Sequence, residues 1–122
     1  MSGAATLSLR IPDPIAAKLR SLAAIEHRSL ADMVRILTEE ALKQREFPEI
    51  TFYNGPTGRR ARLTDGPDVW EIIAPYALSG CEWSALEESF PDVNERVLRA
   101  AIRYYEQYAE EIDARIALNE RG

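Results

Sequence analysis

The sequence predicts a mainly α protein with a short N-terminal β-strand, a small hairpin and a trihelical C-terminal domain with a long last helix. Three observations predict this fold class. Apolar and polar residues alternate over residues 6–11, apolar residues recur at helical spacing along much of the chain, and turn residues at 54–58 separate two β-prone stretches. We place a domain boundary after Glu46, which gives a domain at 1–46 and another at 47–122.

The alternation at residues 6–11 gives a strand with two different faces. The apolar face consists of Leu7, Leu9 and Ile11, and the polar face consists of Thr6, Ser8 and Arg10. The backbone N–H and C=O groups of a strand need partners, and no second strand follows nearby in the sequence. Either the C-terminal region or a second copy of the chain must therefore pair with it.

Two helices are expected after the strand. Asp13 can cap the first helix and Pro14 suits its first position. Its apolar positions are Ile15, Leu19, Leu22 and Ile25. Ser29 can cap the second helix, which should lose its apolar stripe near Gln44.

The remainder of the chain predicts a hairpin and further helices. Ile50–Tyr53 and residues 59–63 flank turn residues, and Asp65 or Thr64 can begin a helix that Gly80 closes. Residues 84–87 read Ser-Ala-Leu-Glu, a full capping box that should open a short helix. Asp92 and Glu95 form a second cap pair, from which one long helix should run towards Asn119.

Composition limits the possible functions. The 122 residues carry a net charge of −5, which does not by itself indicate nucleic-acid binding, but residues 1–46 carry +1 and residues 47–122 carry −6. Cys81 and His27 are the single cysteine and histidine, so no internal disulfide or metal-site spacing is present. With no bilayer-length apolar run and no apolar leader, we expect a cytoplasmic protein without cofactors or membrane association.

The order strand, Pro/Asp cap, helix, Ser-containing turn and helix over roughly residues 5–45 resembles the ribbon-helix-helix repressors. The resemblance implies a homodimer whose two strands pair into a ribbon that enters the major groove of operator DNA. It implies base contacts by Thr6, Ser8 and Arg10, and phosphate contacts at the second helix by Arg28, Ser29 and Leu30. The alternative is that the polar strand residues are only the solvated side of an amphipathic strand.

The sequence over about residues 50–117 resembles a second family, the antitoxin-associated domain-of-unknown-function family 433. The matching residues are Gly58, Arg62, Leu63, Gly80, Ser84, Glu87, Phe90, Pro91, Ala100, Ala101, Tyr104, Tyr105, Glu110, Glu111, Ile112 and Asp113. The chain departs from the pattern at residues 64–68 and at Arg60-Ala61. The resemblance implies a helix-turn-helix-like trihelical core and a PIN-like ribonuclease toxin as the partner.

Three further groups of residues each have two interpretations. A possible second DNA contact comprises Arg59, Arg60 and Arg62 in the hairpin and Arg96, Arg99 and Arg103 on one helix face. A possible toxin contact comprises Tyr108, Glu110, Glu111 and Asp113. The alternatives are solvated surfaces with local ion pairs, and a tyrosine stripe that belongs to the core.

These inferences converge on an antitoxin of a type II toxin-antitoxin pair, which also acts as a transcription repressor of its own operator. The alternatives are a stand-alone regulator whose C-terminal domain serves oligomerisation or a second DNA contact, and an adaptor with no DNA role. We do not expect an enzyme, because Cys81 and the serines near it lack the base and oxyanion site that a nucleophile needs.

Overall fold

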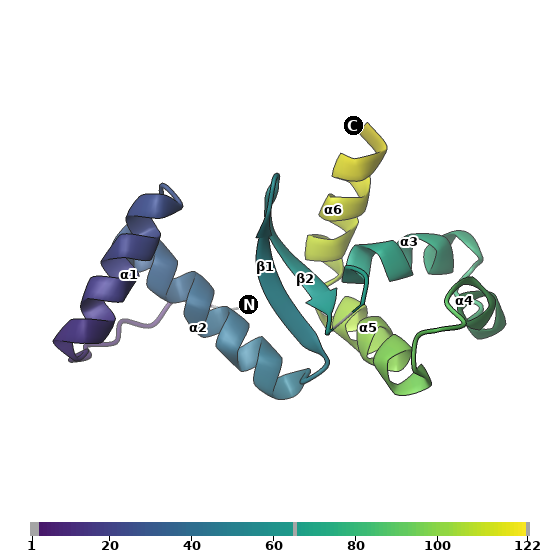
Figure 1. Ribbon diagram of the computed structural model, residues 1–122, viewed down its shortest axis with the longest axis horizontal. Coiled ribbons are helices and arrows are strands. Elements are labelled where there is room, and N and C mark those ends of the chain that lie inside the picture. The colour runs from purple at the N-terminus through teal and green to yellow at the C-terminus, as the bar shows by residue number, and fades with distance from the viewer. Residues whose placement is uncertain (1–2, 65, 122) are drawn as a thin grey trace. The chain divides into compact units, whose positions relative to one another are not determined.

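The computed structural model describes residues 3–64 and 66–121, and the described chain is mainly helical with one two-stranded antiparallel hairpin (Figure 1). The elements in order are α1 (Asp13–Ile25), α2 (Leu30–Glu46), β1 (Ile50–Gly55), β2 (Gly58–Leu63), α3 (Val69–Leu78), α4 (Trp83–Ser89), α5 (Glu95–Gln107) and α6 (Ala109–Arg121). The chain divides into two compact units, Met1–Ala41 and Leu42–Gly122. This division falls within α2, whereas the sequence placed it after Glu46.

The predicted N-terminal strand is not confirmed. Residues 3–12 carry neither helix nor strand in the structure, and their side chains are exposed. A strand is defined by its hydrogen-bonded ladder, which a segment without a pairing partner does not form. The sequence pattern alternates as in a strand, but the described part of one chain provides no partner strand for hydrogen bonding to residues 6–11.

The two predicted helices of the first unit are present. α1 begins one residue earlier than expected, because Pro12 rather than Asp13 is the N-cap and Asp13 is the first helical residue. The expected cap of α2 is confirmed, since the Asp32 backbone N–H donates to Ser29 Oγ at 3.0 Å. Between the helices, His27 takes a left-handed conformation with φ of 55°. Its N–H donates to Ala24 O, which closes the end of α1.

The hairpin of the second unit follows the sequence closely. Ile50 pairs with Leu63 and Phe52 pairs with Ala61, so the apolar residues of both strands share one face. Gly55 and Gly58 form the last pair, and Gly58 has a φ of 117° that favours glycine. The turn predicted at residues 54–58 is therefore confirmed.

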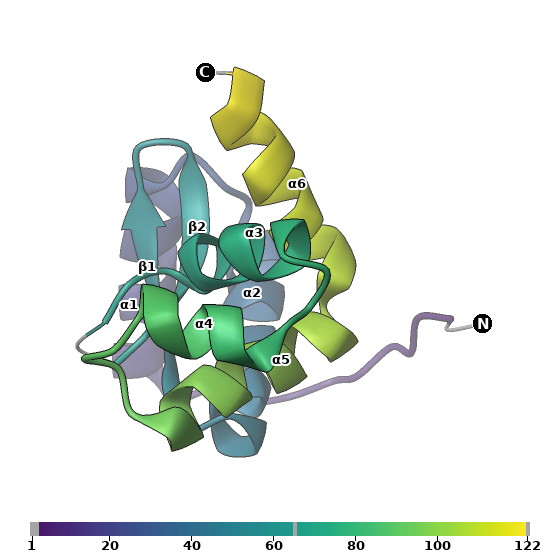
Figure 2. The same cartoon turned by 90° about the vertical axis from the view of Figure 1, so that its right-hand side faces the viewer.

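The helices of the second unit pack around α3, which contacts β2, α4, α5 and α6 (Figure 2). The resulting core is formed by Phe47, Ile50, Ala61, Leu63, Val69, Ile72, Ile73, Leu86, Leu98, Ala101, Tyr104 and Ile112. Contributions come from the hairpin and from four helices. The second unit thus has a hydrophobic core of its own.

Three predicted helix caps in this unit were wrong. The N-cap of α3 is Asp68, whose backbone N–H donates to Glu71 Oε1 at 3.1 Å, rather than Thr64; Asp65 lies outside the described residues. Ser84 is the second residue of α4 rather than its cap, because the helix already starts at Trp83. The cap of α5 is Asn94, whose Oδ1 accepts the Arg96 N–H at 2.8 Å.

The predicted long last helix is two helices. α5 ends at Gln107, Tyr108 leaves the helical conformation with φ −123° and ψ 42°, and α6 starts at Ala109. The break brings Tyr104 of α5 into hydrogen-bonding contact with Glu111 of α6. Within the described ranges, no helix is both long and apolar enough to span a bilayer.

Candidate functional site

The residues predicted to read DNA bases lie on an open segment. Thr6, Ser8 and Arg10 are exposed, as predicted for side chains that face a ligand or solvent. The alternate residues are exposed as well, since Leu7 retains 78% and Leu9 retains 73% of its accessible surface. Both faces of the segment are therefore accessible within one chain.

The first unit also exposes apolar residues on its helices. Large apolar side chains with at least a third of their surface exposed are Ile15, Leu22, Ile25 and Leu30 on α1 and α2, and Ile11 just before α1. Within residues 3–41, Ala23 and Met33 are the apolar side chains that are buried. An isolated unit of this size with so little buried apolar surface is expected to be unstable alone.

The residues predicted to bind phosphate lie at the start of α2. Ser29 is used as the N-cap, and the N–H groups of the first helical residues, beginning with Leu30, have no intrahelical acceptor by helix geometry. Arg28 is shared between two carboxylates, with Nε 3.5 Å from Glu26 Oε1 and Nη1 3.4 Å from Asp32 Oδ2. Phosphate would therefore compete with these two carboxylates for Arg28.

Two arginines of the hairpin form contacts within the second unit. Arg60 and Arg62 pair across the hairpin with Tyr53 and Thr51, so the four side chains share a face. The Arg62 guanidinium lies 5.3 Å from the centre of the Tyr53 ring, and Arg60 Nη1 lies 3.6 Å from Asp68 Oδ2. Arg59 lies on the opposite face and is half-buried. The predicted basic cluster is therefore divided between the two faces.

Asp68 is the buried acceptor that organises this face of the hairpin. Only 5% of its surface is exposed. The Tyr53 hydroxyl donates to both of its carboxylate oxygens at 2.8 Å, and Trp70 Nε1 donates to Oδ2 at 3.1 Å. These contacts and Arg60 compensate the buried charge. Asp68 was not among the residues predicted from the sequence, although an Asp directly before a helix is a common cap signal.

The predicted arginine face of α5 is solvent-accessible. Arg96, Arg99 and Arg103 share one helix face by their spacing of three and four residues, and all three are exposed. Arg96 Nε lies 3.7 Å from Glu49 Oε2 and Arg99 Nε lies 3.5 Å from Glu95 Oε2. The Arg99 guanidinium also lies 4.1 Å from the centre of the Trp83 ring. Surface ion pairs of this kind are weak, so the face remains available to an anionic partner.

The residues predicted to contact a toxin surround the break between α5 and α6. Glu111 accepts hydrogen bonds from Lys43 Nζ at 2.9 Å and from the Tyr104 hydroxyl at 2.9 Å, while Asp113 accepts one from Tyr105 at 2.8 Å. Glu110 is exposed. Glu111 and Asp113 are exposed as well, but their hydrogen bonds connect the two helices and occupy their carboxylates.

Tyr108 at the break belongs to an aromatic cluster. Its ring centre lies 4.8 Å from that of Tyr104 and 6.3 Å from that of Phe47, and Lys43 Nζ lies 4.4 Å from it. Partial burial, followed by the nearby Glu46 carboxylate, raises the pKa of Tyr108. Tyr108 is thus part of the packing at the break as well as a partly exposed residue.

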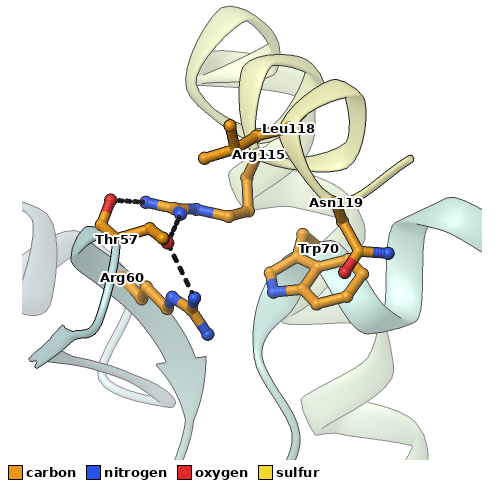
Figure 3. Close-up of a pocket in the computed structure, with 6 residues that line it drawn as sticks. All are labelled: Thr57, Arg60, Trp70, Arg115, Leu118 and Asn119. Atoms are coloured by element: carbon orange, nitrogen blue, oxygen red, sulfur yellow. Dashed lines mark hydrogen bonds between the residues drawn. The ribbon is translucent and has the colours of Figure 1, made fainter. Parts of the chain in front are cut away.

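A pocket of about 230 Å³ lies between the hairpin and two helices of the second unit (Figure 3). It is lined by Thr57, Arg60, Trp70, Arg115, Leu118 and Asn119. Both guanidinium groups donate to Thr57 Oγ1, from Arg60 Nη2 at 2.9 Å and from Arg115 Nη1. The pocket was not predicted from the sequence, because its residues come from three separate parts of the chain and Arg115 belongs to no motif.

The described part of the chain contains no cluster of side chains that could hold a metal ion. Over residues 3–64 and 66–121, no three His, Cys, Asp or Glu side chains are close enough together to hold a metal ion. Cys81 is exposed and has a φ of 62°.

Comparison with known proteins gave no match: no family model, no curated protein and no solved structure is significantly similar to this chain.

Proposed function

We propose that this protein is a homodimeric DNA-binding antitoxin that represses its own operator and neutralises a PIN-like ribonuclease toxin through its C-terminal domain. The observation that carries the DNA-binding part is the exposed alternating segment at residues 6–11, with Leu7, Leu9 and Ile11 accessible on one side. The toxin partner is inferred from the resemblance to the antitoxin-associated family.

The alternating segment favours pairing with a second copy of itself. Pairing would satisfy its backbone groups and would cover its apolar side against the exposed apolar residues of the helices. Complete burial of a Leu or Ile side chain contributes about 1.5–3 kcal/mol. Seven such side chains are exposed in this unit: Leu7, Leu9, Ile11, Ile15, Leu22, Ile25 and Leu30. A symmetric dimer is the simplest assembly that removes them from water.

The polar side of the paired segment would then read DNA. Thr6, Ser8 and Arg10 have side chains suited to base edges, and an arginine can donate to both O6 and N7 of guanine. The start of α2 would contact the phosphate backbone through Ser29 and the N–H groups of Leu30 and its neighbour. Arg28 would assist once it leaves Glu26 and Asp32.

The second unit is proposed to bind the toxin because it has its own core and carries most of the negative charge. An acidic surface suits a ribonuclease, whose RNA-binding cleft is basic. Glu110 is the foremost candidate for this contact, with Tyr108 beside it at the break between α5 and α6. Glu111 and Asp113 would participate only by exchanging their present partners.

The exposed arginine face of α5 favours one alternative, a stand-alone regulator whose second unit also touches DNA. Arg96, Arg99 and Arg103 could contact phosphates from one helix face. Co-expression with the product of the adjacent gene separates the two functions. An antitoxin should co-purify with that product through residues 42–122, whereas a stand-alone regulator should not.

DNA reading is tested by fluorescence anisotropy with the DNA upstream of the gene, over a salt series. Arg10→Ala should cost about 1–3 kcal/mol of specific binding and relax the preference at one base pair. Arg20→Ala, at an exposed position of α1, is the matched control. Equal weakening on all DNA sequences would make Arg10 a phosphate contact, and no selective binding by the wild type, with or without the co-expressed partner, would contradict the proposal.

A further inference from the structure

The pocket between β2, α3 and α6 has the features of an anion site. Two guanidinium groups, those of Arg60 and Arg115, converge on the single hydroxyl of Thr57 (Figure 3). A neutral hydroxyl does not compensate two positive charges, so the two groups repel each other at this point. An anion bound beside Thr57 would remove this repulsion and accept hydrogen bonds from both.

The two arginines differ in how their charge is already compensated. Arg60 Nη1 lies 3.6 Å from the Asp68 carboxylate, which also accepts hydrogen bonds from Tyr53 and Trp70. Among the described residues, Arg115 has no carboxylate oxygen within 4.0 Å, and its other contacts are the carbonyl oxygens of Thr57 at 3.2 Å and Arg59 at 3.4 Å. Glu111 borders a small adjoining cavity, but Lys43 and Tyr104 already donate to it. A half-buried, uncompensated arginine therefore faces the pocket.

The other walls are suited to a planar ring. Trp70 provides an indole whose Nε1 is held by Asp68 Oδ2, so the ring is fixed before any ligand arrives. Leu118 retains 42% of its surface and adds an apolar side chain at the rim, and Asn119 adds an amide that can donate and accept. A volume of about 230 Å³ suits a ligand smaller than most drug-sized molecules.

We propose that this pocket binds a small phosphate ester that carries a planar ring, of the size of a nucleoside monophosphate. The phosphate contacts the guanidinium groups of Arg60 and Arg115, because arginine matches phosphate with paired donors. The ring contacts Trp70 and Leu118. This inference is independent of the proposed DNA reading by residues 6–11, since all six lining residues belong to the second unit.

Isothermal titration calorimetry on the full chain tests this site with the four ribonucleoside 5′-monophosphates. The comparison ligands are inorganic phosphate, ribose 5-phosphate and the corresponding nucleosides. At least one monophosphate should bind saturably, at least tenfold more tightly than phosphate, ribose 5-phosphate or its nucleoside. Binding of phosphate alone with equal affinity would overturn the role of the ring, and binding only of a longer oligonucleotide would overturn a small-molecule site.

Variants locate the binding in the pocket. Arg115→Gln should weaken binding at least tenfold, whereas Arg121→Gln, on the same helix outside the pocket, should leave it unchanged. Arg115 also donates hydrogen bonds to the hairpin turn, so its replacement could change the fold as well as the pocket. A second variant, Leu118→Glu, keeps the hydrogen bonds of Arg115. It should place a carboxylate at the rim and weaken binding to a similar degree. Unchanged affinity in both pocket variants, or absence of binding by all four nucleotides, would refute the proposal.

Discussion

At the scale of single residues, Asp68 is the buried charged side chain among the described residues of the second unit. Its carboxylate is buried and accepts hydrogen bonds from Tyr53 and Trp70. Its backbone N–H donates to the Glu71 side chain at the start of α3. One side chain thereby connects β1, α3 and, through Arg60, β2. This arrangement also fixes the indole that lines the proposed ligand pocket.

Asp68→Ala should lower the free energy of unfolding by about 1–3 kcal/mol, because it leaves the partly buried donors of Tyr53 and Trp70 without this acceptor. Urea denaturation followed by circular dichroism measures this loss. Asp92→Ala, at an exposed position, is the matched control and should change stability by no more than about 0.5 kcal/mol. Equal effects of the two substitutions would show that the hydrogen bonds to Asp68 contribute little.

Tyr105 gives the protein a defined response to alkaline pH. The hydrogen bond to Asp113, followed by partial burial, raises the pKa of the Tyr105 hydroxyl. Since the neutral phenol is favoured in the folded state, its contribution to stability is complete below the unfolded pKa near 10.0 and is lost as the pH rises through the folded pKa.

Tyr105→Phe should therefore destabilise the protein by about 0.5–1 kcal/mol between pH 6 and 9, and this difference should disappear above the folded pKa. Urea denaturation at several pH values measures it. Tyr76 and Tyr108, whose pKa values are also raised by partial burial, titrate in both proteins and cancel in the comparison. A difference that persists unchanged in strong alkali would contradict the role of the hydroxyl.

At the scale of the elements, two serines that look alike in sequence have different roles. Ser29 lies before α2 and accepts the N–H of Asp32, whereas Ser84 lies inside α4 and is exposed. Both precede an acidic residue three positions later, which is the sequence signal of a capping box. The structure thus separates a real cap from an apparent one.

Ser29→Ala should cost about 1 kcal/mol of stability, the usual loss at an N-cap. Ser84→Ala should cost nothing or stabilise by a few tenths of a kcal/mol, because alanine is the better residue inside a helix. Thermal denaturation of the two variants compares them directly. A loss of stability for Ser84→Ala as large as that for Ser29→Ala would indicate that Ser84 caps α4 after all.

The division of the last helix into α5 and α6 is also decided at this scale. The apolar stripe runs without interruption from Val97 to Ile116, and no Pro or Gly stands between them. Tyr108 nevertheless leaves the helix, where it packs against Phe47 and Tyr104 beneath Lys43. Two of these contacts, those with Phe47 and Lys43, come from residues far away in the sequence.

At the scale of the whole molecule, the two units differ in how they bury apolar surface. The second unit encloses twelve buried core residues, whereas residues 3–41 contribute Ala23 and Met33 and expose seven large apolar side chains. The first unit is therefore expected to depend on assembly for its stability.

The apolar residues of the segment 6–11 are expected to serve dimer assembly, and its polar residues are expected to serve DNA binding. Leu9→Ala should weaken the dimer at least tenfold, because it removes apolar surface from the proposed interface. Ser8→Ala is the matched neighbour and should leave the dimer intact. Sedimentation equilibrium at micromolar concentration measures both. A wild-type protein that remains monomeric under these conditions would contradict the ribbon interpretation.

Short-range sequence pattern was enough to predict most of the regular elements of this chain. Periodicity and turn residues predicted α1, α2, the hairpin and α3, because each depends on residues that are close together along the chain. The tertiary structure alone decided the buried role of Asp68, the left-handed residue His27, the break at Tyr108 and the pocket between Arg60 and Arg115. These features depend on which distant side chains meet, or on a conformation that the residue type does not favour. Local sequence pattern therefore did not reveal them, although an Asp directly before a helix did mark Asp68 as a possible cap.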